Sequence, residues 1–130
     1  MILQDGVLKS FCLSNFAARK TGLTRAANQS GAYFLHPGEK SLEELIAGIE
    51  NGILINRFSG GAPGPSGDFN GVAKNSFLIR NGRLVGAVTE TMISGNFSHL
   101  LQNLRGISRE TACDGMTVLP WAAFDGVTVK

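Results

Sequence analysis

Seventeen glycines are the feature that most constrains this 130-residue sequence, because they fall largely between segments of periodic hydrophobicity. Glycine adopts backbone conformations that other residues avoid, so it marks tight turns and the ends of helices and strands. The sequence therefore predicts short elements joined by tight turns. Two helices and several strands are expected.

The first expected helix runs over Ser41–Glu50. Ser41 and Glu44 have the spacing of a capping box, and Asn51–Gly52 ends the helix. The apolar residues follow the i, i+3, i+4, i+7 pattern of one buried helix face, which predicts a packing helix. They are Leu42, Leu45, Ile46 and Ile49.

The second expected helix begins after an Asn96 cap, runs to Arg105 and ends at Gly106. One of its faces is apolar, with Phe97, Leu100, Leu101 and Leu104. It is also predicted to be a short packing helix.

The dipeptide Asn81–Gly82 predicts a β-hairpin, because it supplies the positive φ angles of a type I′ turn. Its strands would be Ala73–Arg80 and Arg83–Met92. The expected cross-strand pairs are Ile79 with Leu84, Leu78 with Val85 and Phe77 with Gly86. Both faces of the hairpin are expected to be largely covered. The segment Ser59–Gly67, with four glycines and two prolines, is expected to be an irregular loop.

Further short strands are predicted at Val7–Leu13, Ala32–Leu35, Ile53–Phe58, Thr117–Trp121 and Val127–Val129. Together with the hairpin and the two helices they predict an α+β fold, a sheet-rich single domain over residues 1–130 with mixed or antiparallel strands.

Composition excludes several classes of function. Twelve Lys and Arg residues are scattered and the net charge is +2, so no basic surface for nucleic acid is expected. No apolar run approaches the length of a membrane span, so no membrane partner is expected. Cys12 and Cys113 have no disulfide-framework spacing, which favours a reducing, cytoplasmic location. The 43% hydrophobic and 17% charged fractions suit a domain that packs against another domain or subunit.

Six motifs occur in an order that resembles the C-terminal part of TldD/PmbA proteins, over nearly the whole chain. They are DGVLKSF at Asp5–Phe11, ARKTG at Ala18–Gly22, PGEKSLEEL at Pro37–Leu45, SGDF at Ser66–Phe69, IRNGRLVGAV at Ile79–Val88 and ISGNFSHLL at Ile93–Leu101. Each motif is weak alone, whereas all six in order are not expected by chance. The sequence is thus identified as a TldD/PmbA C-terminal domain.

This resemblance implies a zinc metallopeptidase of intracellular proteolysis or peptide maturation. Active members carry an HExxxH helix before this domain, and its two histidines bind zinc together with a later cysteine. The present sequence has no HExxxH and only two histidines, His36 and His99. It is therefore expected not to be catalytic by itself and to hold no zinc alone.

The partners that the resemblance implies are the missing N-terminal domain, a homo- or hetero-oligomeric subunit of the same family, and a peptide substrate. The alternative function is a non-catalytic interaction or scaffold subunit of the gyrase-modulator type. A free-standing hydrolase that uses Cys113 with His99 is a third hypothesis, which requires the two to meet in space.

Cys113 lies near the place of the family's cysteine ligand, which usually stands directly before a glycine. Here Asp114 comes between Cys113 and Gly115, so Asp114 is the alternative metal ligand. Cys113 could instead be a small buried apolar residue, as many free cysteines are.

Gly67, Asp68 and Phe69, from the SGDF motif, are the candidate residues of a substrate cleft. Asp68 could equally cap a turn and order the backbone there. His99 is expected on the surface of the second helix, and His36, before a proline, at the entry to a loop.

Overall fold

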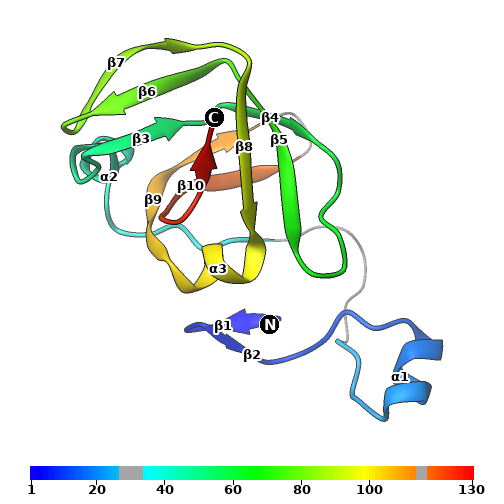
Figure 1. Cartoon of the computed structure of the whole chain (residues 1–130). Helices are drawn as coiled ribbons and strands as arrows, with labels where there is room; N and C mark the ends of the chain where they lie inside the picture. Colours follow the sequence, from blue (N-terminus) through cyan, green and yellow to red (C-terminus); the bar gives the residue numbers. More distant parts are fainter. Residues whose placement is uncertain (27–33, 114–116) are drawn as a thin grey trace. The chain divides into compact units, whose positions relative to one another are not determined.

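The structure, a computed structural model, describes residues 1–26, 34–113 and 117–130 (Figure 1). The chain divides into two compact units, Met1–Tyr33 and Phe34–Lys130. Among the described residues, no helix has the length and apolar character needed to cross a bilayer.

The first unit contains a small hairpin and one helix. Strands β1 (Leu3–Gln4) and β2 (Val7–Leu8) pair around Asp5 and Gly6, whose φ angles are 50° and 75°. Helix α1 (Asn15–Thr21) is capped by Ser14, whose Oγ accepts a hydrogen bond from the amide of Ala17 at 3.1 Å. The sequence analysis missed this helix, and of the predicted strand Val7–Leu13 only the first two residues are confirmed.

The second unit is built from antiparallel strands in three sheets. One sheet has the order β11-β8-β5-β4, another β3-β6-β7, and the third is the pair β10-β9. The strands are β3 (Asn51–Leu54), β4 (Arg57–Gly60), β5 (Asp68–Lys74), β6 (Ser76–Arg80), β7 (Arg83–Val88), β8 (Thr91–Asn96), β9 (Leu104–Cys113), β10 (Val118–Phe124) and β11 (Thr128–Val129). The predicted sheet-rich α+β fold is confirmed.

Residues with positive φ divide the long predicted strands. Asn75 (φ 49°) separates β5 from β6, and Glu90 (φ 53°) lies between β7 and β8. The expected strand Ile53–Phe58 is also two strands, β3 and β4. The sequence analysis missed these breaks because no glycine marks them. Of the predicted strand Ala32–Leu35, the first two residues lie outside the described residues.

The predicted Asn81–Gly82 turn is confirmed, with φ angles of 48° and 74°. Ile79 faces Leu84 as expected, but the next pairs are Leu78 with Gly86 and Phe77 with Ala87. A β-bulge causes this shift, because Val85 has no opposite residue in β6 and every later pair moves by one.

Both expected helices are present but shorter than predicted. Helix α2 (Leu42–Ala47) has the predicted capping box, with Ser41 Oγ 3.1 Å from the Glu44 amide nitrogen and Glu44 Oε2 2.6 Å from the Ser41 amide nitrogen. It ends at Gly48. Helix α3 (Phe97–Gln102) ends at Asn103, because the chain from Leu104 onward pairs with β10 instead of continuing the helix.

The segment before α2 runs beside β9. The amide of Gly38 donates to the Ser108 carbonyl at 3.0 Å, and the amide of Arg109 donates to the Lys40 carbonyl at 2.7 Å. The amide of Leu42 donates to Glu110 Oε2 at 2.9 Å. These bonds hold the start of α2 against β9.

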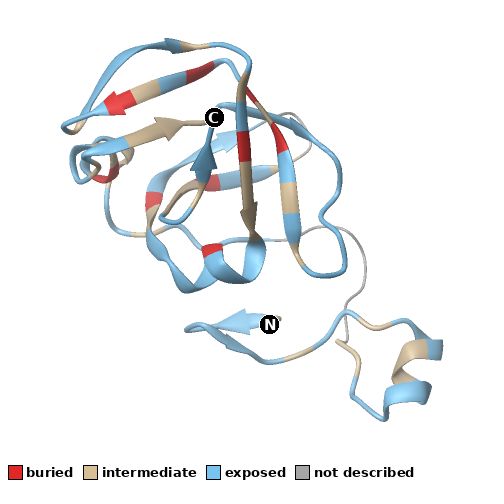
Figure 2. Cartoon of the chain, in the orientation of Figure 1, coloured by how far each residue is buried: buried red, intermediate tan, exposed pale blue. Residues whose placement is uncertain are grey.

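The buried core is small (Figure 2). It comprises the apolar side chains of Leu45, Ala73, Ile79, Ile93 and Leu100. Among the described residues, twenty large hydrophobic ones are exposed, including Leu84 and Val85 of β7. The expectation that both faces of the β6–β7 hairpin are covered is therefore wrong: β7 has only Val88 partly buried.

Candidate functional site

Asp68 lies at the start of β5, where the glycine-rich loop ends, and both of its carboxylate oxygens accept a hydrogen bond. Asn96 Nδ2 donates to Oδ1 at 2.8 Å, and Ser66 Oγ donates to Oδ2 at 2.7 Å. Asn96 Nδ2 also donates to the Ser66 carbonyl at 3.0 Å. The carboxylate and the amide thus fix the loop to the end of β8.

Asn96 joins this loop to helix α3 as well. Its Oδ1 caps the helix by accepting from the amides of Ser98 at 2.9 Å and His99 at 3.4 Å. The Phe97 amide donates to the Gly67 carbonyl at 2.9 Å. We call Ser66, Gly67, Asp68, Asn96 and Phe97 the Asp68 network.

The hydrogen bonds from Asn96 and then Ser66 hold the pKa of Asp68 below its ordinary value, and the nearby His99 acts in the same direction. Asp68 is therefore an ionised acceptor at neutral pH. With both oxygens engaged, it orders backbone, as the turn-capping interpretation expected. Asp68 is the sequence neighbour of the two other cleft candidates, Gly67 and Phe69.

Phe69, the residue after Asp68, lines an apolar hollow of about 470 Å³. Its ring is tilted against Phe97 at a centroid distance of 5.2 Å and edge-on to Phe58 at 6.0 Å. We call this space the apolar hollow; its lining is Ile55, Phe58, Gly60, Gly61, Ala62, Pro63, Phe69, Ile93, Phe97, Leu100, Phe124 and Val127. A site of this size and chemistry suits an apolar side chain or a small apolar ligand.

Cys113 is the last residue of β9 and pairs in register with Val118 of β10. It is exposed, so the interpretation as a buried apolar residue is wrong. The alternative ligand Asp114 lies outside the described residues. Figure 1 shows this end of β9 away from α3, so the structure does not bring Cys113 to the Asp68 network.

The two histidines are 63 positions apart in the sequence. His99 is exposed on α3, as predicted, and His36 is exposed with its ring edge-on to Phe34 at 4.9 Å. Within residues 1–26, 34–113 and 117–130, no three His, Cys, Asp or Glu side chains form a group that could hold a metal ion. A zinc site needs three or four such ligands, so the described residues do not fit a complete zinc site by themselves.

Sequence reasoning missed how the cleft candidates are joined to their surroundings. Asn96 was recognised only as a helix cap, and its second role toward Asp68 depends on the β5–β8 register that places the two residues opposite each other. Phe58, Phe69 and Phe97 come from three different elements. No spacing along the chain could have signalled that they line one hollow.

Comparison with known proteins gives a consistent result. The family model of the PmbA/TldA metallopeptidase C-terminal domain matches residues 1–130. A metalloprotease of Methanothermobacter thermautotrophicus is 30% identical over 122 residues, which are 85% of this chain and 27% of that protein. A metalloprotease of Archaeoglobus fulgidus is 31% identical over 125 residues, 88% of this chain and 29% of that protein.

Solved structures share the fold. A candidate modulator of DNA gyrase from Bacteroides thetaiotaomicron superposes with a TM-score of 0.82 at 32% identity, covering 98% of this chain and 29% of that one. TldE from Thermococcus kodakarensis gives a TM-score of 0.73 at 26% identity, covering 98% and 33%. The present chain thus spans about a third or less of each of these proteins.

Proposed function

This chain belongs to the PmbA/TldD metallopeptidase family and matches its C-terminal domain, and on that premise we propose that it forms one wall of the peptide cleft of a zinc metallopeptidase without being catalytic by itself. The proposal rests on the residues that could bind a metal: the sequence has two histidines, 63 positions apart, and no HExxxH motif. The metal-binding helix is then supplied by another part of a longer protein, or by a second subunit.

Zinc would act in the assembled enzyme as a Lewis acid and as the source of an activated water. This chain would add at most one ligand to a site held by histidines from elsewhere. Cys113 is the first candidate, because it is exposed at the end of β9 where a metal could reach it. Asp114 is the alternative.

The wall of the cleft is formed by Gly67, Asp68 and Phe69 together with the apolar hollow. The hydrogen bonds of the Asp68 network fix the backbone at this point, so little conformational entropy is lost when a peptide binds. The hollow then receives an apolar side chain of that peptide. The reaction so served is proteolysis or peptide maturation in the cytoplasm.

A second candidate function is a non-catalytic interaction subunit of the gyrase-modulator type. It is favoured by the exposed large hydrophobic residues, twenty in the part of the chain that the structure describes, and by the similarity to the Bacteroides protein and to TldE. In this case the same surfaces bind a partner chain and no metal is required.

Zinc content separates the two functions. Elemental analysis of this chain and of the full-length product of its gene, purified in parallel, should find about one zinc per protein in the full-length product only. Replacing Cys113→Ser in the full-length product should lower zinc occupancy about tenfold, whereas Cys12→Ser, the other exposed cysteine, should not.

Each other outcome is informative. Zinc lost in Asp114→Asn and kept in Cys113→Ser would transfer the ligand to Asp114. Zinc in neither protein would favour the interaction subunit, and stoichiometric zinc in this chain alone would contradict the proposal.

A further inference from the structure

The second unit contains a second cavity, of about 280 Å³, which is lined by helix α2 and by strands β3, β6, β9, β10 and β11. We call it the α2 cavity. Phe97 lines the apolar hollow and not the α2 cavity. Three residues line both spaces: Ile55, Phe124 and Val127. The two spaces are therefore neighbours with largely different walls.

The apolar residues of α2 and of the turn after it line this cavity and stay partly open. The spacing of Leu42, Leu45, Ile46 and Ile49 predicts one buried face, yet of these four only Leu45 is buried and the others are half-buried. Side chains that face a cavity have fewer dispersion contacts than side chains in a packed core. An apolar group bound in the cavity would supply the missing contacts.

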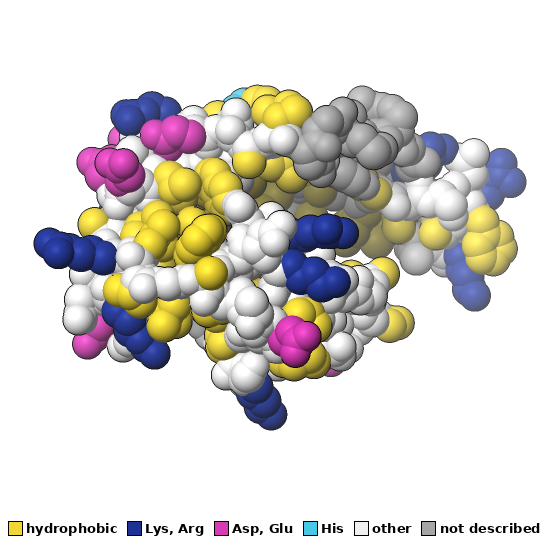
Figure 3. All heavy atoms as spheres, turned by 90° about the horizontal axis from the view of Figure 1, so that it is seen from above, with side chains coloured by type: hydrophobic (Ala, Val, Ile, Leu, Met, Phe, Trp, Pro, Cys, Tyr) yellow, Lys and Arg dark blue, Asp and Glu magenta, His cyan; other side chains and the backbone are white. Residues whose placement is uncertain are grey.

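The α2 cavity differs from the exposed apolar surface of the molecule. Figure 3 shows hydrophobic side chains gathered on the outside, between basic and acidic ones. An outer patch has no walls, whereas the α2 cavity surrounds a molecule from several elements. Small-molecule sites usually have volumes of roughly 300–1,000 Å³, and the α2 cavity lies just below that range. Its ligand is therefore small, of the size of a single amino acid.

One guanidinium and one carboxylate lie at the mouth of the cavity. Arg105 and Asp125 both line it, and their side chains are 49% and 61% exposed. Arg105 Nε lies 3.4 Å from Asp125 Oδ2, and Arg105 Nη1 donates to the Gly48 carbonyl at 3.4 Å. Both distances exceed the roughly 2.7–3.2 Å of an ordinary N–H···O hydrogen bond. The guanidinium thus keeps donors for a ligand, and an exposed ion pair of this kind opens at little cost.

The two charges at the mouth determine the polar end of the ligand. A zwitterion can place its carboxylate at Arg105 and its ammonium group at Asp125. A simple carboxylate would be repelled by Asp125, and a simple amine would be repelled by Arg105. An α-amino acid with an aliphatic side chain meets both conditions, because that side chain suits the leucine and isoleucine side chains of the lining.

We propose that the α2 cavity binds a free aliphatic α-amino acid, with its side chain against the apolar residues of α2 and its charged groups on Arg105 and Asp125. Amino acids of this class are end products of peptide hydrolysis, so the site would respond to product in a peptidase. The binding itself rests on neither the peptide cleft nor zinc.

Trp121 provides the readout, because it is the only tryptophan of the sequence and it lines the cavity. Titration of the 130-residue chain with L-leucine should change the fluorescence of Trp121 to saturation. It should also raise the thermal unfolding midpoint, because the ligand binds only the folded state. L-Serine keeps both charges and lacks the aliphatic side chain; as the control ligand it should leave both signals unchanged.

Two further ligands test the charges on the unaltered chain. Isocaproate is leucine without its ammonium group, and isoamylamine is leucine without its carboxylate. Each should bind at least about tenfold more weakly than leucine, because each loses a charge-assisted hydrogen bond and meets a like charge at the mouth.

Variants assign the two contacts. Arg105→Gln and Asp125→Asn should each weaken leucine binding about tenfold. Asp125→Asn should strengthen the binding of isocaproate, because it removes the repelling carboxylate, and Arg105→Gln should strengthen the binding of isoamylamine for the corresponding reason. A gain of binding cannot come from a variant that has failed to fold.

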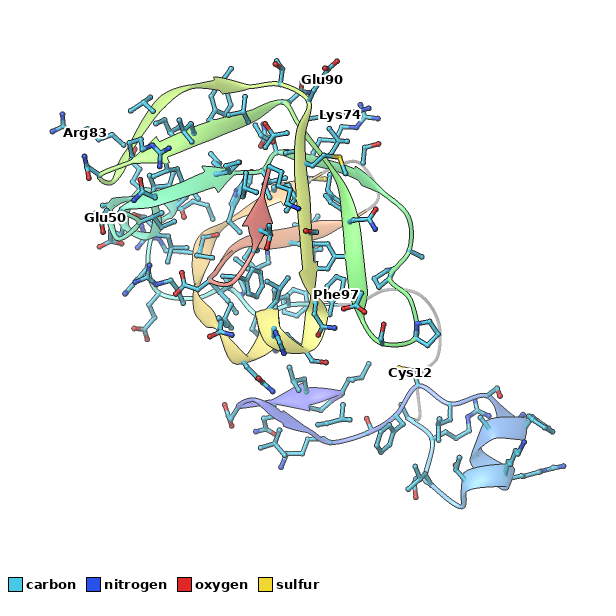
Figure 4. All side chains as sticks on the ribbon, viewed as in Figure 1. Cys12, Glu50, Lys74, Arg83, Glu90 and Phe97 are labelled. Carbon is cyan, nitrogen blue, oxygen red and sulfur yellow. The ribbon has the colours of Figure 1, made fainter. Side chains whose placement is uncertain are left out.

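Arg83→Gln and Glu90→Gln are the matched control variants. Arg83 begins β7 and Glu90 follows its end (Figure 4), and neither is among the residues that line the cavity. Both variants should bind leucine like the parent. Phe97→Ala changes the apolar hollow alone and should also leave leucine binding unchanged.

Four outcomes would each overturn the proposal. Leucine up to its solubility limit could leave the Trp121 fluorescence and the unfolding midpoint unchanged, or serine could act like leucine. Isocaproate or isoamylamine could bind as tightly as leucine, or the Arg105 and Asp125 variants could bind leucine like the parent.

Discussion

At the scale of single residues, Asp68 stabilises the fold as an anion. Because its pKa is lower in the folded protein than in the unfolded chain, its stabilising effect is fully present above the unfolded pKa, near 3.8, and is lost as pH falls through the folded value. Asp68→Asn should therefore lower the unfolding midpoint at pH 7. The difference from the parent should shrink as the pH falls below 3.8 and through the lowered folded pKa.

Urea unfolding at pH 7 and at a series of pH values below 3.8 measures this effect. Glu50→Gln is the matched control, because it removes a charge from an exposed carboxylate for which the described part of the chain shows no hydrogen bond from a side chain. A difference between Asp68→Asn and the parent that stays the same from pH 7 to the lowest pH of the series would show that the carboxylate charge is not what stabilises the loop.

The residue scale also shows where sequence reasoning stops. Asp68 was a turn-capping candidate from its place after a glycine-rich segment, and its bond to Ser66 spans two residues. Its bond to Asn96 spans 28 residues and exists only because β5 and β8 pair in one register. The role of Cys113 as a zinc ligand stays a prediction.

At the scale of elements, helix α2 depends on its capping box. Ser41→Ala removes the side-chain acceptor for the Glu44 amide and should cost about 1 kcal/mol of unfolding free energy. Chemical denaturation measures the change. Ser98→Ala, the same substitution on the exposed surface of α3, should stay within about 0.5 kcal/mol of the parent; an equal loss in both would contradict the capping role.

The starts of α2 and α3 were predictable because capping uses side chains within three residues. Their ends were not. Leu104 continues the helical spacing of Phe97, Leu100 and Leu101, yet it begins a strand of ten residues that pairs with β10. Propensity and spacing are local, whereas a ladder formed with a distant strand can override them.

At the scale of the second unit, the open apolar hollow should bind apolar dyes. The chain is expected to enhance the fluorescence of 8-anilinonaphthalene-1-sulfonate, and Phe97→Ala should weaken dye binding about tenfold by removing a ring from the lining. Leu101→Ala removes a more exposed side chain that does not line the hollow and should have no such effect. Equal losses in both variants would place the dye elsewhere.

The predicted apolar character of the surface is likewise visible only at this scale. A 43% hydrophobic composition pointed to a domain that packs against a partner, and the exposed large side chains agree. Composition could not say where they gather. The hollow arises because strands that are far apart in the sequence lie next to one another in the sheet.

The contact between the start of α2 and β9 also sets an order of events during synthesis. Leu42 and Glu110 are 68 residues apart. A ribosome adding roughly 5–20 residues per second needs roughly 3–14 seconds to make that distance. For that interval the nascent segment around Gly38–Lys40 has left the catalytic centre of the ribosome while its β9 neighbour does not yet exist. The contact between the start of α2 and β9, and with it the folding of this unit, can therefore be completed only after β9 has been made.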